Sequence, residues 1–210
     1  MQKIVPAILE QDPEETKKKL LLFKGVSEWV QIDIADGVFV NNRTHSVQDI
    51  PKESQMFATE VHLMVQDPEA HFTACQKIGA NRVIFHLSRA EDLSRILKTL
   101  RSHTFEWGIA LNPDVPVSGI VPYINHIQSL LIMSVVPGFQ GSLFVPAVLQ
   151  KIAQARLAKQ NILVGVDGGV DENNISSVFR AGADYACVGS AIFNTENPMQ
   201  TFQKLCKMVE

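Results

Sequence analysis

Two polar residues stand inside an apolar segment near the start of the chain, where bare burial would be costly. Gln31 and Asp33 flank Ile32. Because successive residues of a β-strand point to opposite faces, Gln31 and Asp33 share one face and Ile32 points the other way. A polar pair in an apolar strand must be hydrogen-bonded or must bind something. The pattern therefore predicts a site around this pair, or a capping role for Asp33 at the turn that Asp36 and Gly37 form.

Histidines lie in the next two apolar segments. In the first of them, the same alternation puts Glu60, His62 and Met64 on one face. His86 ends the second. An imidazole at such a position is either a ligand or a structural hydrogen-bonding group, and the sequence leaves both interpretations open. The other histidines fall in predicted loops or helices and are expected at the surface; they are His45, His71, His103 and His126.

Glycine-rich turns follow the last three apolar segments. Glycine lets backbone N–H groups approach an anion closely, and the N-terminus of a following helix adds its dipole. Turns also need glycine for their own geometry, so one such turn is weak evidence. Three in succession predict a phosphate-binding site. Its expected residues are Gly138, Phe139, Gln140 and Gly141 in the first turn, Gly168 and Gly169 in the second, and Gly189 and Ser190 in the third.

Short apolar segments alternate with amphipathic segments along the whole chain, and most are rich in Val, Ile and Leu, as strands buried on both faces are. The predicted strands are Ile4–Leu9, Trp29–Ile34, Ala58–Met64, Arg82–His86, Trp107–Leu111, Leu130–Val135, Ile162–Val166 and Tyr185–Val188. The predicted helical segments are one that begins at Pro13, a short one within Thr44–Ile50, and Pro68–Ile78, Glu91–Leu100, Val117–Tyr123, Pro146–Ala158, Glu172–Arg180 and Pro198–Met208.

This alternation fits either a closed eight-fold barrel or an open doubly wound sheet. No glycine-rich dinucleotide fingerprint follows the first predicted strand, where Leu9-Glu10-Gln11-Asp12-Pro13 stands instead. The strand count and the glycine turns after the last strands favour the barrel. We therefore predict one α/β domain over residues 1–210, a (β/α)8 TIM barrel whose ligand binds at the C-terminal ends of the strands.

The composition excludes several classes of function. The 210 residues are 46% hydrophobic and 20% charged, with a formal net charge of −3, as in ordinary soluble globular proteins. The tight basic run Lys17–Lys19 follows two acidic residues, so no nucleic-acid or membrane surface is expected. We see no signal peptide and no apolar run near the ~20 residues of a membrane span. Three separated cysteines favour a reducing, cytoplasmic setting.

Taken together, these motifs resemble the ribulose-phosphate 3-epimerase family over nearly the whole chain. The matching stretches stand in the family's order: Pro6-Ala7-Ile8-Leu9, Asp33-Ile34-Ala35-Asp36-Gly37-Val38-Phe39-Val40, Val61-His62-Leu63-Met64, Leu111-Asn112-Pro113, Met133-Ser134-Val135-Val136-Pro137-Gly138-Phe139, Asp167-Gly168-Gly169-Val170 and Gly189-Ser190-Ala191-Ile192-Phe193. The resemblance implies a barrel that inverts C3 of a ketose phosphate and so interconverts ribulose 5-phosphate and xylulose 5-phosphate.

The resemblance also implies roles for individual residues. Two carboxylates on opposite sides of C3 exchange its proton in the family, and they match Asp33 and Asp167. Family members usually hold a divalent metal with His, Asp, His and Asp. Asp33, His62 and Asp167 match three of these ligands and Gln31 stands at the fourth, while His62 is also expected to contact substrate. The implied metal is Zn, Fe, Mn, Co or Mg, and a metal-free pocket is the alternative.

This chain departs from the family pattern around the predicted site. Gln31 replaces the first ligand histidine, Ala7 replaces a serine that contacts substrate, and Ala35 replaces a methionine. The loop Asn41–Ser46 lacks the proline and glycine of the family's loop, and an acidic residue near Ser88 is absent. Several changes around one pocket indicate an altered metal preference, an altered substrate or lost activity.

Three functions therefore compete at this point. The first is a ketose-phosphate 3-epimerase, an isomerase, acting on ribulose 5-phosphate. The second is a protein that binds a sugar phosphate but has little epimerase activity, because the phosphate turns are intact while the metal ligands are not. The third is another phosphosugar enzyme on the same barrel: an epimerase of a hexulose phosphate, an isomerase or a lyase. Self-association into a homo-oligomer is a further expectation, with no other macromolecular partner.

Overall fold

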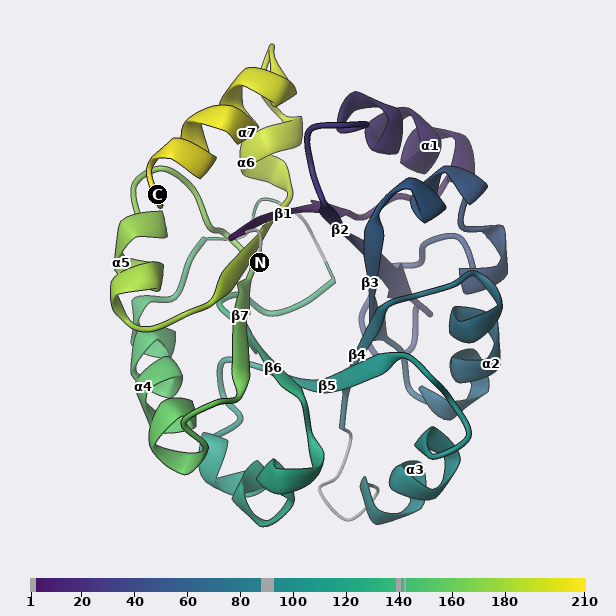
Figure 1. The fold of residues 1–210 in the computed structure, drawn as a ribbon, viewed down its shortest axis with the longest axis vertical. Coiled ribbons are helices and arrows are strands. Elements are labelled where there is room, and N and C mark those ends of the chain that lie inside the picture. Colours follow the sequence, from purple (N-terminus) through teal and green to yellow (C-terminus); the bar gives the residue numbers. More distant parts are fainter. Residues whose placement is uncertain (1–2, 88–92, 139–140, 142) are drawn as a thin grey trace.

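A computed structural model describes residues 3–87, 93–138, 141 and 143–210. Its strands form one closed parallel barrel in chain order, with β8 returning to pair with β1 (Figure 1). The strands are β1 (Ile4–Ile8), β2 (Trp29–Ala35), β3 (Ala58–Met64), β4 (Arg82–His86), β5 (Glu106–Leu111), β6 (Ser129–Met133), β7 (Leu163–Asp167) and β8 (Tyr185–Val188). All the predicted strands are present, and the predicted TIM barrel is confirmed.

The helices surround the barrel (Figure 1). They are α1 (Pro13–Leu22), α2 (Glu69–Lys77), α3 (Leu93–Leu100), α4 (Leu149–Ala158), α5 (Ile175–Arg180), α6 (Ser190–Phe193) and α7 (Pro198–Lys207). The tighter 3₁₀ segments are η1 (Val47–Asp49), η2 (Lys52–Met56), η4 (Val117–His126) and η5 (Pro146–Val148). Pro122 stands inside η4 and cannot donate a backbone hydrogen bond, which disfavours a regular α-helix there.

The strands bury both of their faces. Outward-facing Val, Ile and Leu side chains pack against the helices in one continuous core. The inward-facing side chains form a second apolar cluster inside the barrel: Val5, Ala7, Ile84, Ala110, Leu131, Met133, Tyr185 and Cys187. Gly165 gives Tyr185 its space, because a Cβ at Gly165 would lie 2.3 Å from Cζ of the ring. The barrel interior is therefore largely apolar, and the polar side chains within it are buried.

One set of charges lies wholly inside the barrel. Glu60 and Arg82 are 0% and 1% exposed, and Arg82 Nε lies 3.1 Å from Glu60 Oε2. Tyr185 donates its hydroxyl hydrogen to the same carboxyl oxygen at 3.0 Å. The guanidinium also packs over the rings of Trp29 and Tyr185, 4.4 and 4.9 Å from their centroids. Burial raises the pKa of Glu60, and the charge of Arg82 opposes that rise.

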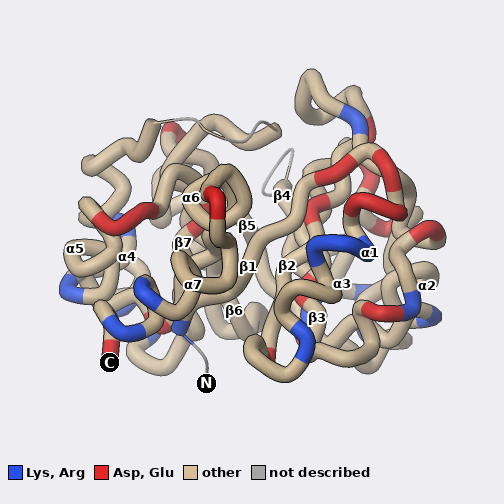
Figure 2. Tube along the Cα trace, turned by 90° about the horizontal axis from the view of Figure 1, so that it is seen from above, with Lys and Arg blue, Asp and Glu red and all other residues tan. Residues whose placement is uncertain are grey.

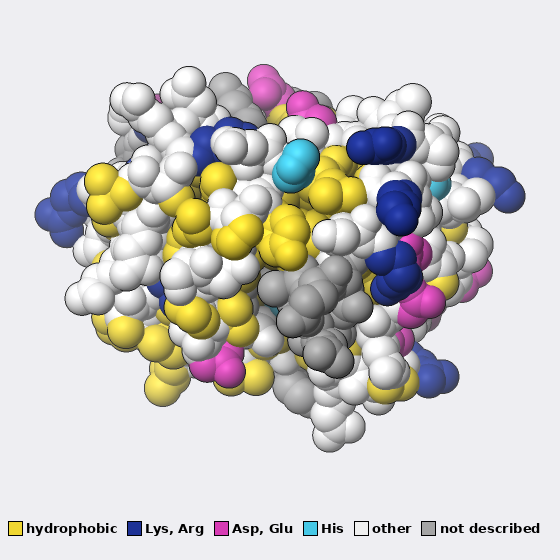
Figure 3. All heavy atoms as spheres, turned by 90° about the horizontal axis from the view of Figure 1, so that it is seen from below, with side chains coloured by type: hydrophobic (Ala, Val, Ile, Leu, Met, Phe, Trp, Pro, Cys, Tyr) yellow, Lys and Arg dark blue, Asp and Glu magenta, His cyan; other side chains and the backbone are white. Residues whose placement is uncertain are grey.

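The outer surface carries charges of both signs. Lys and Arg are spread over several outer helices (Figure 2). Apolar side chains gather on the face shown in Figure 3. Among the described residues, no helix has the length and apolar character needed to cross a bilayer. The cytoplasmic setting and self-association stay predictions.

One surface prediction is wrong. His45 is only 7% exposed, because it packs under α1. One of its ring nitrogens lies 2.8 Å from Thr16 Oγ1 and the other 3.0 Å from the Ser46 carbonyl oxygen. A loop histidine is buried here because both of its nitrogens find partners there.

Candidate functional site

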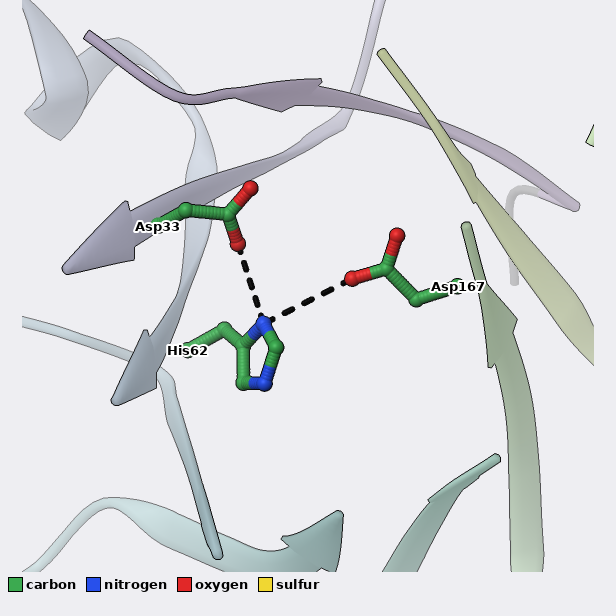
Figure 4. Close-up of side chains that lie close together, drawn as sticks. All are labelled: Asp33, His62 and Asp167. Atoms are coloured by element: carbon green, nitrogen blue, oxygen red, sulfur yellow. Dashed lines mark hydrogen bonds and ion pairs between the residues drawn. The ribbon is translucent and has the colours of Figure 1, made fainter. Parts of the chain in front are cut away.

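Two carboxylates and one imidazole meet inside the C-terminal mouth of the barrel (Figure 4). Asp33 comes from β2, His62 from β3 and Asp167 from the last position of β7. Nδ1 of His62 lies 3.0 Å from Asp33 Oδ1 and 3.5 Å from Asp167 Oδ2. One potential ligand atom from each residue lies within 4.8 Å of the other two. The predicted gathering of these three residues is thus present in the structure.

Gln31 is hydrogen-bonded to both carboxylates of the cluster. Its Nε2 donates to Asp33 Oδ1 at 2.9 Å and to Asp167 Oδ2 at 2.8 Å. Its Oε1 is buried and accepts no hydrogen bond. Gln31 and Asp33 share a face as the alternation predicts, and Asp33 does not cap the following turn. The amide therefore touches both carboxylates and leaves one oxygen without a partner.

Mutual electrostatics set the protonation of this cluster in the metal-free protein. Burial raises the pKa of Asp33, and the hydrogen bond from His62 opposes that rise. Burial lowers the pKa of His62, but the hydrogen bonds to Asp167 and Asp33 and their charges overcome it and raise the pKa to about 10. A cationic imidazole thus neutralises part of the carboxylate charge when no metal does so.

His86 lies behind His62. Nε2 of one ring is 2.9 Å from Nε2 of the other, and the Phe39 ring packs on His86 with centroids 4.8 Å apart. His86 is not one of the three clustered ligand residues. Burial, followed by the charge of His62, holds the pKa of His86 well below its ordinary value. The structure therefore makes His86 a neutral hydrogen-bonding partner of His62.

A cavity at the barrel mouth connects this cluster to the glycine turns. It holds about 530 Å³ of empty space, part of it open to solvent. Its lining includes Asp33, His62, Asp167, Gly138, Gly141, Gly168, Gly169, Gly189 and Ser190. Met64 and Met133 give it apolar walls. Phe139 and Gln140 lie outside the described residues.

Two of the glycines are required by the local backbone. Gly138 has a φ of 112°, and a Cβ there would lie 2.8 Å from Cβ of Val40. Gly168 has a φ of 106°, and its Cβ would lie 2.3 Å from Cγ2 of Val135. The turns after β6 and β7 therefore need glycine for close packing, whatever ligand they bind.

Two polar side chains, Asp36 and Asn42, hold the loops around the cavity. The Asp36 carboxylate accepts from the backbone N–H groups of Val38, Phe39 and Gln66, at 2.8, 2.8 and 2.7 Å. Asn42 Nδ2 donates to the Gly138 carbonyl oxygen at 2.7 Å, so the altered loop Asn41–Ser46 still contacts the turn after β6. Asp36 therefore stabilises the turn that the sequence predicts at Asp36 and Gly37.

Ser134 is a supporting residue that the sequence reasoning missed. Its backbone N–H donates to the Asp167 carbonyl oxygen at 2.7 Å, and its hydroxyl donates to the same oxygen at 3.0 Å and to that of Gly168. These bonds fix the backbone that carries Asp167. The available signal was a polar residue inside the predicted apolar strand Leu130–Val135, the same signal that identified Asp33.

The two alanine departures lie in different places. Ala7 lines the cavity, so the family's serine hydroxyl is missing from the cavity wall. Ala35 packs with Val40 and Met64 beside the mouth. Ser88 lies outside the described residues. The changes therefore remove one polar group from the wall and leave the two carboxylates in place.

This arrangement can do two kinds of chemistry. Two carboxylates and an imidazole nitrogen are suitable ligands for a divalent cation. Two carboxylates at one cavity can also take a proton from a bound carbon acid and return one. Backbone N–H groups in glycine turns suit the phosphate of the same ligand.

Comparisons with known proteins show the family and the fold. The model of the ribulose-phosphate 3 epimerase family matches residues 3–193. The ribulose-phosphate 3-epimerase of Bacillus subtilis (strain 168) is 30% identical over 220 residues, covering 98% of this chain and 98% of that protein. The enzyme of the same name from Mycobacterium tuberculosis (strain H37Rv) is 30% identical over 203 residues, covering 93% and 87%. A solved 3-hexulose-6-phosphate synthase shares the fold, with a TM-score of 0.74 over 100% of both chains at 16% identity.

Proposed function

Because this chain belongs to the ribulose-phosphate 3-epimerase family, we propose that it interconverts ribulose 5-phosphate and xylulose 5-phosphate. The observation that carries the proposal is that both carboxylates and all three glycine turns line one cavity. A ligand held by its phosphate at the turns would place its carbon chain beside Asp33 and Asp167. An epimerase assay with ribulose 5-phosphate and the purified protein tests this directly.

The reaction needs one proton to leave C3 and another to return on the opposite face. One carboxyl group starts ionised and takes the C3 proton, which leaves an enediolate. The other starts protonated and gives its proton to C3 from the other side, so the two protonation states are exchanged after one turnover. Burial raises the pKa of Asp33, which favours its protonated form. His62 lies between the two carboxylates and holds their orientation.

The residues present fit a divalent metal. Asp33, His62 and Asp167 offer three ligand atoms within 4.8 Å of one another. Oε1 of Gln31 has no hydrogen-bond partner, and a flip of the amide group, which exchanges its oxygen and nitrogen, would make this oxygen the fourth ligand atom. We propose these four residues as the ligands. When bound, the ion would act as a Lewis acid that polarises the ketose oxygens.

Gln31 should set the metal preference. An amide oxygen is a hard neutral donor that suits Mn²⁺ or Mg²⁺, whereas an imidazole suits Zn²⁺, Fe²⁺ and Co²⁺. We expect Gln31→His to bind Zn²⁺ at least about ten-fold more tightly than the parent protein does. Mutating residues that only hydrogen-bond to a metal's ligands already changes metal affinity by this factor, and Gln31→His changes a ligand itself. Competition with a chromogenic chelator measures the affinity, and Gln31→Leu is the matched control without a donor. If Gln31→His gains neither Zn²⁺ affinity nor epimerase rate, Gln31 does not determine the metal site, and Ala7 or the loop Asn41–Ser46 becomes the leading explanation.

The phosphate should be held by backbone groups, because no particular side chain is needed at a glycine turn. We expect Gly189→Val to weaken ribulose 5-phosphate binding at least about ten-fold, on the scale of one lost hydrogen bond to a charged group. Gly119→Val is the control, because a Cβ there meets nothing within 4 Å and Gly119 does not line the cavity. Calorimetry measures the affinity and circular dichroism checks the fold. Equal affinities in the parent and Gly189→Val would refute the assignment of this turn.

A further inference from the structure

Polar side chains lie at or near the C-terminal ends of three neighbouring strands, β3, β4 and β5. His62 lies in β3, His86 ends β4 and Asn112 directly follows β5. Nε2 of His62 and Nε2 of His86 are 2.9 Å apart, and the Asn112 side chain is close enough to the His86 ring to act on its pKa. Both histidines are buried, with 0% and 4% exposure. These side chains therefore form a line from the two carboxylates, through both rings, to the amide.

Only one proton can lie between the two Nε2 atoms. If His62 carries it, His86 accepts, and Nδ1 of His62 is left to face Asp33 and Asp167 as a metal ligand or, when cationic, as a donor. If His86 carries it, neutral His62 must hold its own proton on Nδ1, and this atom cannot ligate a metal. The proton position on His86 therefore decides what Nδ1 of His62 can do.

The Asn112 amide favours one of these two states. Its Oδ1 is buried and has no hydrogen-bond partner, so it needs a donor. Because His62 occupies Nε2 of His86, Nδ1–H is the donor that the ring can offer it. Lys151 Nζ donates to the carbonyl oxygens of Asn112 and Val115, at 2.7 and 2.6 Å, and fixes this turn.

We propose that His86 is a positioning residue that keeps the proton of His62 on Nε2, and that Asn112 does the same for the proton of His86 on Nδ1. With these two hydrogen bonds in place, Nδ1 of His62 faces the two carboxylates whether or not a metal is bound. The inference rests on the proposed function, in which this Nδ1 atom serves the reaction. His86 itself does not line the cavity, so it acts through His62.

The proton positions can be observed without any activity. In ¹⁵N-histidine-labelled protein, long-range ¹H–¹⁵N correlation spectra separate protonated from bare ring nitrogens. We expect protonated Nε2 in His62, and in His86 a protonated Nδ1 with a bare Nε2. Asn112→Leu should increase the fraction of His86 that is protonated on Nε2. Finding His86 protonated on Nε2 and His62 bare there in the parent protein would overturn the inference, whether or not the protein proves to be an epimerase.

Two replacements of His86 separate positioning from packing. His86→Gln keeps an acceptor oxygen near the Nε2 position, whereas His86→Leu removes it. We expect His86→Leu to lose about 10–100-fold in Zn²⁺ affinity, and to lose epimerase kcat with little change in KM. His86→Gln should retain most of both, and His126→Leu, at an exposed position, should match the parent. Equal losses in the Gln and Leu variants would overturn the acceptor role.

Discussion

Replacing Asp33 or Asp167 by Asn should lower epimerase kcat by about 10²–10⁴-fold, the usual contribution of an acid–base group. The substitution keeps the shape of the side chain and removes its capacity to exchange a proton. Each aspartate lies on its own strand beside His62, with 8% of its surface exposed. Because one carboxylate must serve each face of C3, neither should compensate for the other. Steady-state assays in both directions give the size of the loss.

Asp67→Asn is the matched control, since Asp67 is exposed and does not line the cavity. It should keep the parent rate. Calorimetry with ribulose 5-phosphate should show that Asp33→Asn and Asp167→Asn still bind, because the glycine turns are untouched. A parent-like rate in either variant would show that the acid–base assignment is wrong.

Replacing Arg82 by Met should cost about 3–5 kcal/mol of unfolding free energy, as expected when one member of a buried ion pair is removed. Glu60 would remain fully buried with its charge no longer opposed by a guanidinium. Urea unfolding of the parent and the variant measures the difference. The effect concerns the stability of the barrel, because Arg82 does not line the cavity.

A substitution of Glu60, the ion-pair partner of Arg82, tests whether the loss of stability comes from this pair. Glu60→Gln keeps an acceptor oxygen for the Tyr185 hydroxyl but removes the charge. In the double variant Glu60→Gln/Arg82→Met no unpaired charge stays buried, so its loss should be clearly smaller than the sum of the two single losses. Strictly additive losses would mean that Glu60 and Arg82 do not stabilise each other.

The sequence was sufficient to predict the barrel, because strands buried on both faces leave a strong signal. Segments such as Arg82–His86 and Tyr185–Val188 are bounded by turn residues and have their predicted ends in the structure. Helical form was harder to predict. η4 is a 3₁₀ segment with Pro122 inside it, and its apolar residues alone do not distinguish it from an α-helix.

The candidate site was predictable where alternation along one strand fixes direction, as for Gln31 and Asp33. The contacts between strands were not predictable, because they depend on which side chains meet across the barrel. Sequence left His86 open between a ligand and a structural group, and the bond to His62 appears only in three dimensions. The same holds for His45, whose burial depends on Thr16 from a different element.

The most direct test of the central claim is proton exchange at C3 of ribulose 5-phosphate in deuterated water, followed by proton NMR. The two-carboxylate mechanism predicts that the parent protein forms xylulose 5-phosphate with deuterium at C3, and that Asp33→Asn and Asp167→Asn slow this incorporation together with epimerisation. If ribulose 5-phosphate protects the parent protein against thermal unfolding but no deuterium enters at C3, the chain binds a sugar phosphate without epimerising it, and the central claim is wrong.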